Sequence, residues 1–83
     1  MTIAKPEPTS DNLLLKKELF SADDYAEAIN KELTRIETFT AQLSELNRRD
    51  SYSTEGMAFL IGFSSEMIQK YAAIKWEKLR NAN

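Results

Sequence analysis

The chain has 83 residues, with 11 Lys and Arg against 13 Asp and Glu, and it contains neither His nor Cys. The length fits one domain, and 42% apolar with 29% charged residues is the balance of a globular protein. Without His or Cys there is no imidazole base, no thiol nucleophile, no disulfide and no thiolate metal site. We therefore expect no enzyme, no cofactor, no metal and no small-molecule substrate.

Targeting signals are also lacking in the sequence. The longest apolar run, Met57-Ala58-Phe59-Leu60-Ile61, is far shorter than the ~20 apolar residues of a membrane-spanning helix. The first residues have no basic head followed by an apolar block, so no secretory signal is visible. The expectation is a cytoplasmic protein that does not enter a membrane.

The chain begins with a polar segment that contains both of its prolines, Pro6 and Pro8. Because Pro interrupts helices and this segment has little to bury, residues 1–10 are predicted to form a flexible arm. Residues 11–83 are predicted to form a single helical domain. A short first helix is expected to start at Ser10 or Asp11, both good N-caps, and to run to Phe20.

A second, long helix is expected to start after Ser21. Ser21 and Asp24 have the spacing of a capping box, with Asp in place of the usual Glu. Beyond them, apolar residues recur at steps of three and four over about 25 residues, which is close to a heptad seam. The residues that carry this period are Tyr25, Ile29, Leu33, Ile36, Phe39, Leu43 and Leu46.

A third helix is predicted from Thr54 to Arg80, after a polar loop over residues 47–53. Two long helices of similar length joined by a short loop give an antiparallel hairpin. The predicted fold class is therefore all-α: a short N-terminal helix plus a long antiparallel helical hairpin, assembled as a dimeric helical bundle.

The third helix has more apolar residues than one face needs. Met57, Phe59, Leu60, Ile61 and Phe63 spread around nearly its full circumference. We expect this excess to be covered either by the first helix folding across that end or by a second copy of the chain.

The composition and the surplus apolar surface predict a protein–protein interaction module, such as an adaptor, an inhibitor or a regulatory subunit. It would act through amphipathic helix packing, with a homodimer as the expected assembly. Trp76, on a polar flank, is expected either to anchor a protein partner or to pack on the first helix or the arm. The predicted interface residues are Tyr25, Ile29, Leu33, Ile36, Leu43, Phe59, Phe63 and Trp76.

The alternative hypothesis is a small dimeric DNA-binding regulator. Gly62-Phe63-Ser64-Ser65 fits the turn of a helix-turn-helix, with apolar or small residues at the template positions around it. In that case a recognition helix would present Ser64, Ser65, Gln69 and Lys70 to DNA. If Gly62 instead lies inside one continuous helix, residues 54–80 form the second arm of the hairpin. Against the alternative stands the net charge of −2, since DNA binders usually carry a basic stripe.

Overall fold

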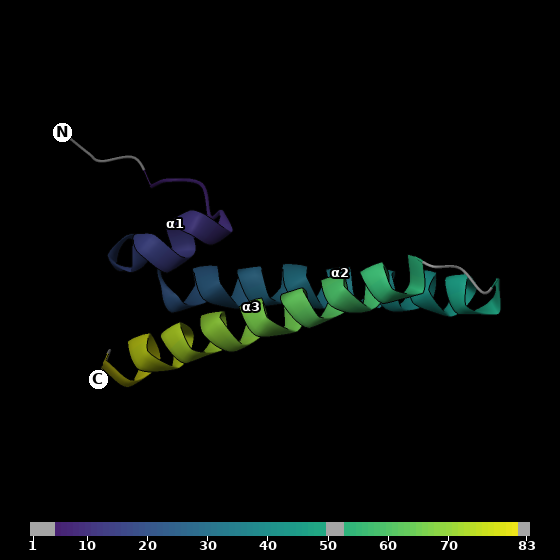
Figure 1. The fold of residues 1–83 in the computed structure, drawn as a ribbon. Helices are drawn as coiled ribbons and strands as arrows, with labels where there is room; N and C mark the ends of the chain where they lie inside the picture. The colour runs from purple at the N-terminus through teal and green to yellow at the C-terminus, as the bar shows by residue number, and fades with distance from the viewer. Residues whose placement is uncertain (1–4, 50–52, 82–83) are drawn as a thin grey trace.

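The computed structural model describes residues 5–49 and 53–81, and within these ranges every regular element is a helix. Helix α1 spans Ser10–Leu15, a 3₁₀ turn η1 spans Lys17–Leu19, α2 spans Ala22–Arg48 and α3 spans Ser53–Asn81. The two long helices lie side by side and antiparallel, and α1 sits across one end of them (Figure 1). This confirms the predicted all-α fold of a short helix and a helical hairpin.

Helix α1 begins where the sequence predicts, but it ends earlier. Its N-cap is Thr9, whose hydroxyl oxygen accepts a 3.2 Å hydrogen bond from the amide of Asn12, so neither Ser10 nor Asp11 is the cap. The helix stops at Leu15 and the 3₁₀ turn follows, whereas the sequence predicts one helix up to Phe20. The Leu13 carbonyl of α1 and the Lys17 carbonyl of η1 each accept a hydrogen bond from a side chain of the hairpin, as described below.

The predicted capping box at the start of α2 is confirmed. The Ser21 hydroxyl accepts from the Asp24 amide at 3.3 Å, and the Ser21 amide donates to the Asp24 carboxylate at 2.8 Å. Lys5 forms an ion pair with Asp24 and lies 5.8 Å from the centre of the Phe20 ring. The predicted arm thus contacts the start of α2 through Lys5, while residues 1–4 lie outside the described residues.

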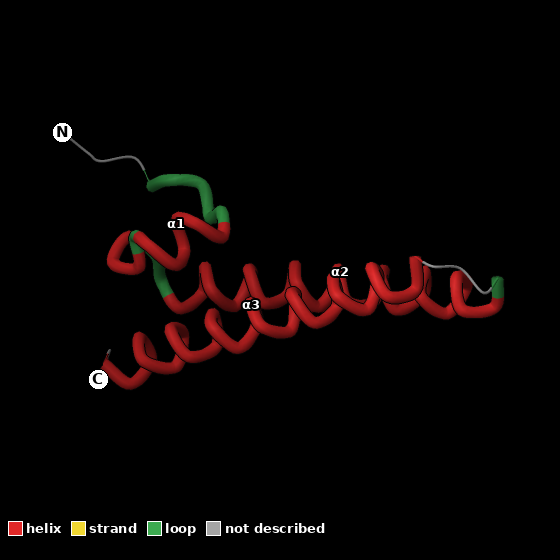
Figure 2. Tube along the Cα trace, in the orientation of Figure 1, coloured by secondary structure: helices red, strands yellow, loops and turns green. Residues whose placement is uncertain are grey.

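Helix α2 extends to Arg48, so the first residues of the predicted 47–53 loop are still helical, and residues 50–52 lie outside the described ranges. Helix α3 is continuous through Gly62, as the unbroken trace in Figure 2 shows. A Cβ at Gly62 would have no atom within 4 Å apart from its chain neighbours and the adjacent backbone of the same helix. The segment from residue 54 to 80 is therefore one helix, without a break at Gly62.

The core lies at the end of the hairpin that α1 crosses. Tyr25 of α2 is completely buried there, with its ring 6.1 Å from that of Tyr71 of α3 and 6.3 Å from that of Phe20. The buried apolar residues are Leu13, Phe20, Tyr25, Ala28, Met67, Tyr71 and Ile74. Because this core draws on three segments of the chain, α1 and the open end of the hairpin stabilise each other.

Candidate protein-interaction surface

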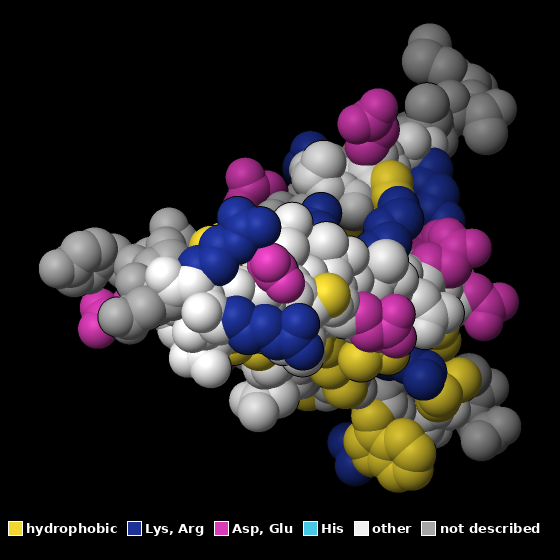
Figure 3. Space-filling view, turned by 90° about the vertical axis from the view of Figure 1, so that its right-hand side faces the viewer, with side chains coloured by type: hydrophobic (Ala, Val, Ile, Leu, Met, Phe, Trp, Pro, Cys, Tyr) yellow, Lys and Arg dark blue, Asp and Glu magenta, His cyan; other side chains and the backbone are white. Residues whose placement is uncertain are grey.

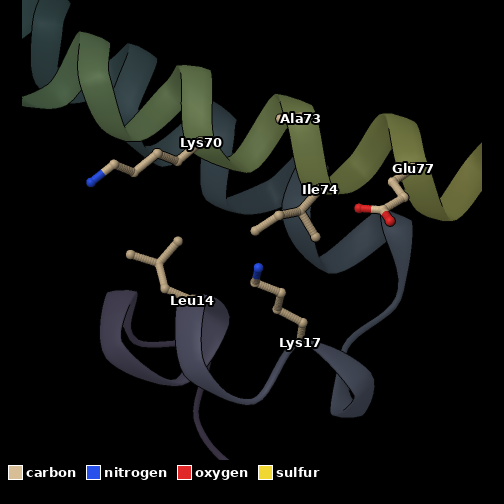
Figure 4. Close-up of a pocket in the computed structure, with 6 residues that line it drawn as sticks. All are labelled: Leu14, Lys17, Lys70, Ala73, Ile74 and Glu77. Atoms are coloured by element: carbon tan, nitrogen blue, oxygen red, sulfur yellow. The ribbon is translucent and has the colours of Figure 1, made fainter.

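The short first helix covers the C-terminal half of α3. A shallow cavity of about 460 Å³ separates α1 and η1 from this half; it is lined by Leu14, Lys17, Lys70, Ala73, Ile74 and Glu77 (Figure 4). The expectation that the first helix folds across the end with Met57 to Phe63 is therefore wrong. The reason is connectivity: a short helix joined to Ser21 stays beside the start of α2, and in an antiparallel hairpin this is where α3 ends.

The opposite half of α3 keeps large apolar side chains exposed. Phe59 is 72% exposed, Phe63 51% and Leu60 40%. We call the two Phe residues together with the neighbouring Leu60 the aromatic strip. Exposed apolar residues scattered singly are normal on a protein surface, whereas Phe59 and Phe63 are four residues apart and therefore lie on the same side of the helix. The strip is the part of the predicted apolar surplus that nothing in the described chain covers.

A second exposed apolar group lies near the C-terminal end of α3. Trp76 is 65% exposed and Leu79 45%. Leu33 of α2 is a separate exposed apolar residue, 46% accessible. At about 100° per residue, Trp76 points roughly 100° around the helix from Phe59, so it belongs to another face. Viewed from the end where α2 finishes and α3 begins, hydrophobic side chains gather at the lower right while charged side chains occupy the centre and top (Figure 3).

The predicted interface residues divide into two groups. Tyr25 is buried in the protein's own core, and Ile29, Ile36 and Leu43 are half-buried in the hairpin. Four predicted residues are exposed and accessible to a partner: Leu33, Phe59, Phe63 and Trp76. Sequence periodicity selected all eight because it identifies apolar faces, but it does not tell a face that the hairpin buries from one that it leaves open.

The four residues of the DNA-binding alternative do not form one surface. Ser64 is only 3% exposed and packs inside the hairpin, whereas Ser65, Gln69 and Lys70 are exposed. At about 100° per residue, Ser65 and Lys70 point in directions roughly 140° apart. The turn that this alternative needs at Gly62 is not formed, since α3 continues through it.

Two side chains of the hairpin form hydrogen bonds to the backbone of α1 and of the following turn, η1. The Tyr25 hydroxyl donates to the carbonyl of Leu13 at 2.6 Å, and the Lys78 ammonium donates to the carbonyl of Lys17 at 2.7 Å. Lys78 also lies 5.7 Å from the centre of the Tyr25 ring. Burial, and secondarily the nearby charge of Asp24, raises the pKa of Tyr25, which keeps its hydroxyl protonated as a donor.

Glu32 is the charged residue that the sequence pattern did not single out. Its side chain is 8% exposed, and one carboxylate oxygen accepts a 2.7 Å hydrogen bond from Arg35. The second oxygen, Oε2, is buried without a hydrogen-bond partner in the described part of the chain. Glu32 lines a cavity of about 290 Å³ together with Tyr71, Arg35 and residues 8–10. Burial, followed by the charge of Glu32, raises the pKa of Tyr71.

Comparison with known proteins gives no match: no family model, no curated protein and no solved structure is significantly similar to this chain. Within residues 5–49 and 53–81, none of the helices has the length and apolar character needed to cross a membrane.

Proposed function

We propose that this protein is a non-enzymatic protein–protein interaction module, of the adaptor, inhibitor or regulatory-subunit kind. It contacts its partners by helix packing, and a second copy of the chain is one of those partners. The observation that carries the proposal is the exposure of Phe59, Phe63 and Trp76, each more than half accessible on a helix that buries only one face in the hairpin. Exposed aromatic residues are the side chains that most often dominate interface energies.

The two apolar groups support two contacts. The aromatic strip supports self-association, because it lies on the half of the hairpin without a covering helix. The group with Trp76 and Leu79 supports docking of a different protein, since it lies on another face of α3 and remains accessible when the strip is covered. A helix-turn-helix regulator has no comparable support, because α3 is unbroken at Gly62 and Ser64 is buried.

Sedimentation velocity over a wide concentration range tests the proposal. We expect a concentration-dependent dimer that ignores duplex DNA at both low and high salt. Phe63→Glu should return the chain to a monomer with unchanged helicity by circular dichroism. Leu15→Glu is the matched control, because Leu15 is 79% exposed but lies on α1, away from the strip.

A monomer at all concentrations would overturn the self-association. Co-sedimentation with DNA at low salt that vanishes at high salt would replace the proposal with a nucleic-acid binder, because phosphate contacts are salt-dependent.

A further inference from the structure

One face of α3 is covered by α1 at its C-terminal half and uncovered at its N-terminal half. Lys70, Ala73 and Glu77 line the cavity beneath α1 and η1. At about 100° per residue, the same side of the helix carries exposed residues toward its N-terminus. We call this side the open face; its residues, all exposed, are Glu55, Phe59, Gly62, Phe63, Glu66 and Lys70.

We propose that the open face binds the open face of a second copy of the chain, with the two α3 helices antiparallel and meeting between Gly62 and Phe63. This inference rests on the proposed function and specifies the partner's orientation and register. In this register Phe63 packs on Gly62 of the other copy, and Glu55 faces Lys70 of the other copy at both ends of the contact.

The two charges at the ends of the open face, Glu55 and Lys70, favour the antiparallel orientation, whereas the third charged residue, Glu66, faces Phe59 of the other copy in this register. Neither Glu55 nor Lys70 has an ion-pair partner among the residues that the structure describes. Figure 4 shows the Lys70 side chain pointing away from Lys17 and Glu77, toward the N-terminal half of α3. A parallel pair would place Glu55 against Glu55 and Lys70 against Lys70, whereas the antiparallel pair places opposite charges together twice.

The shape of the face fits the same register. Gly62 is exposed, and apart from its chain neighbours and the adjacent backbone of α3, no described atom lies within 4 Å of the Cβ that another residue would have there. A Gly in a helix interior allows another element to approach the backbone closely. The adjacent ring of Phe63, 51% exposed, supplies the group that fills this space in the other copy.

The available length and area fit a dimer of moderate size. In this register residues 56–69 of the two α3 helices face each other over about 21 Å, and the Glu55–Lys70 pairs lie at both ends, beside the cavity under each α1. The exposed parts of Phe59 and Phe63 together supply about 250 Å² per copy. This is roughly a third of the ~800 Å² that each partner buries in a standard interface, and the flanking residues supply the rest.

Single-cysteine variants of the full chain test the register, because the native chain contains no Cys. Each variant is treated with a short bismaleimide crosslinker at a concentration where the native chain is dimeric. Gly62→Cys should crosslink with itself, since the two copies of residue 62 lie about one residue apart along the helix axis. Glu55→Cys should not, since its two copies lie about 22 Å apart along that axis. A mixture of Glu55→Cys and Lys70→Cys should crosslink as the mixed pair.

The outcomes separate this inference from the proposed function. Self-crosslinking of Glu55→Cys would overturn the antiparallel orientation while leaving the dimer in place. A dimer that yields neither the Gly62→Cys product nor the mixed product would overturn the open face as its interface. A chain that stays monomeric would overturn both proposals. The mixed pair leaves Gly62 unchanged, so it remains informative if Gly62→Cys itself weakens the dimer.

A charge reversal provides an independent readout of the same contact. Lys70→Glu should weaken the dimer by about fivefold, because each end of the contact then carries two carboxylates. Combining it with Glu55→Lys should restore the native dissociation constant, since the opposite charges then meet in exchanged positions. Additive weakening in the double variant would contradict the Glu55–Lys70 contact.

Discussion

The hydroxyl of Tyr25 donates a 2.6 Å hydrogen bond to the backbone carbonyl of Leu13, and both residues are almost completely buried. Leu13 lies near the C-terminal end of α1, where helix carbonyls lose their partners within the helix. A side chain of α2 thereby supplies the partner that a longer α1 would have supplied itself. The stability of α1 is consequently coupled to the hairpin beneath it.

Tyr25→Phe should destabilise the protein by about 1–3 kcal/mol, because it leaves the Leu13 carbonyl buried without a donor. Urea unfolding followed by circular dichroism measures the change. Tyr71→Phe is the control, because Tyr71 is almost as buried but donates no hydrogen bond within the described residues. The loss of stability in Tyr71→Phe should therefore be clearly smaller. Equal losses in both variants would show that ring packing dominates and the hydrogen bond does not.

The position of α1 explains how far the sequence could predict this structure. Two signals in the sequence are local: the capping box of Ser21 and Asp24, and the apolar periodicity of both long helices. They correctly predicted the two helices of the hairpin and their antiparallel pairing. The end of α1 at Leu15 has no local signal, since neither Gly nor Pro follows. Tyr25 and Lys78, which are distant in sequence, donate to the carbonyls of Leu13 in α1 and Lys17 in η1, and no local pattern indicates these contacts.

The candidate surface could be predicted only in part for a similar reason. Periodicity identified Phe59 and Phe63 as surplus, and their exposure follows from α1 lying at the other end of the hairpin. The same periodicity also selected Tyr25, because a buried position and a partner-binding position have the same spacing on a helix. The two kinds of position can be distinguished only when the location of α1 is known, and the sequence pattern does not determine that location.

Gly62→Ala should stabilise the folded monomer by about 0.5–1 kcal/mol, because Gly62 lies in a helix interior and Ala loses less backbone entropy there. The added methyl group has open space, since no atom outside its chain neighbours and the adjacent helix backbone lies within 4 Å of its position. Thermal unfolding at low protein concentration measures the effect. Gly56→Ala is a useful comparison in the first turn of α3, where the gain should be smaller. A destabilised Gly62→Ala monomer would contradict a continuous helix at this position.

Stability at acid pH should depend on Asp24. The hydrogen bond from the Lys5 side chain, followed by that from the Ser21 amide, holds the pKa of the Asp24 carboxyl below its ordinary value of 3.8. A carboxyl whose pKa is lower in the folded state stabilises above its unfolded pKa. This contribution is therefore complete at neutral pH and is lost as the pH falls below about 4, toward the folded pKa.

Asp24→Asn should accordingly lower stability at pH 7 but make little difference at pH 2, as measured by urea unfolding at both values. Asp23→Asn is the control, because Asp23 lies in the same helical turn without an ion-pair partner in the described residues. In addition, Lys5→Met should raise the Asp24 pKa in an NMR titration. An unchanged pKa would mean that the ion pair does not persist in solution.

The buried carboxylate of Glu32 should lower the free energy of unfolding, and an apolar residue at this position should restore it. Glu32 is 8% exposed and one of its oxygens has no partner within the described residues, so the Arg35 ion pair offsets its desolvation incompletely. Glu32→Met should therefore be neutral or stabilise the protein by about 1 kcal/mol. Arg35→Ala should destabilise it by about 1 kcal/mol, a modest figure because Arg35 is itself 60% exposed.

A double-mutant cycle read by urea unfolding decides whether the pair accounts for these changes. In the Glu32→Met background, Arg35→Ala should have almost no effect, because the charge that Arg35 compensates is gone. If Arg35→Ala destabilises the Glu32→Met variant as much as the native protein, Arg35 acts through packing of its aliphatic stem. A strongly destabilised Glu32→Met would indicate instead that the second carboxylate oxygen has a partner in solution, such as a bound water in the cavity beside Tyr71.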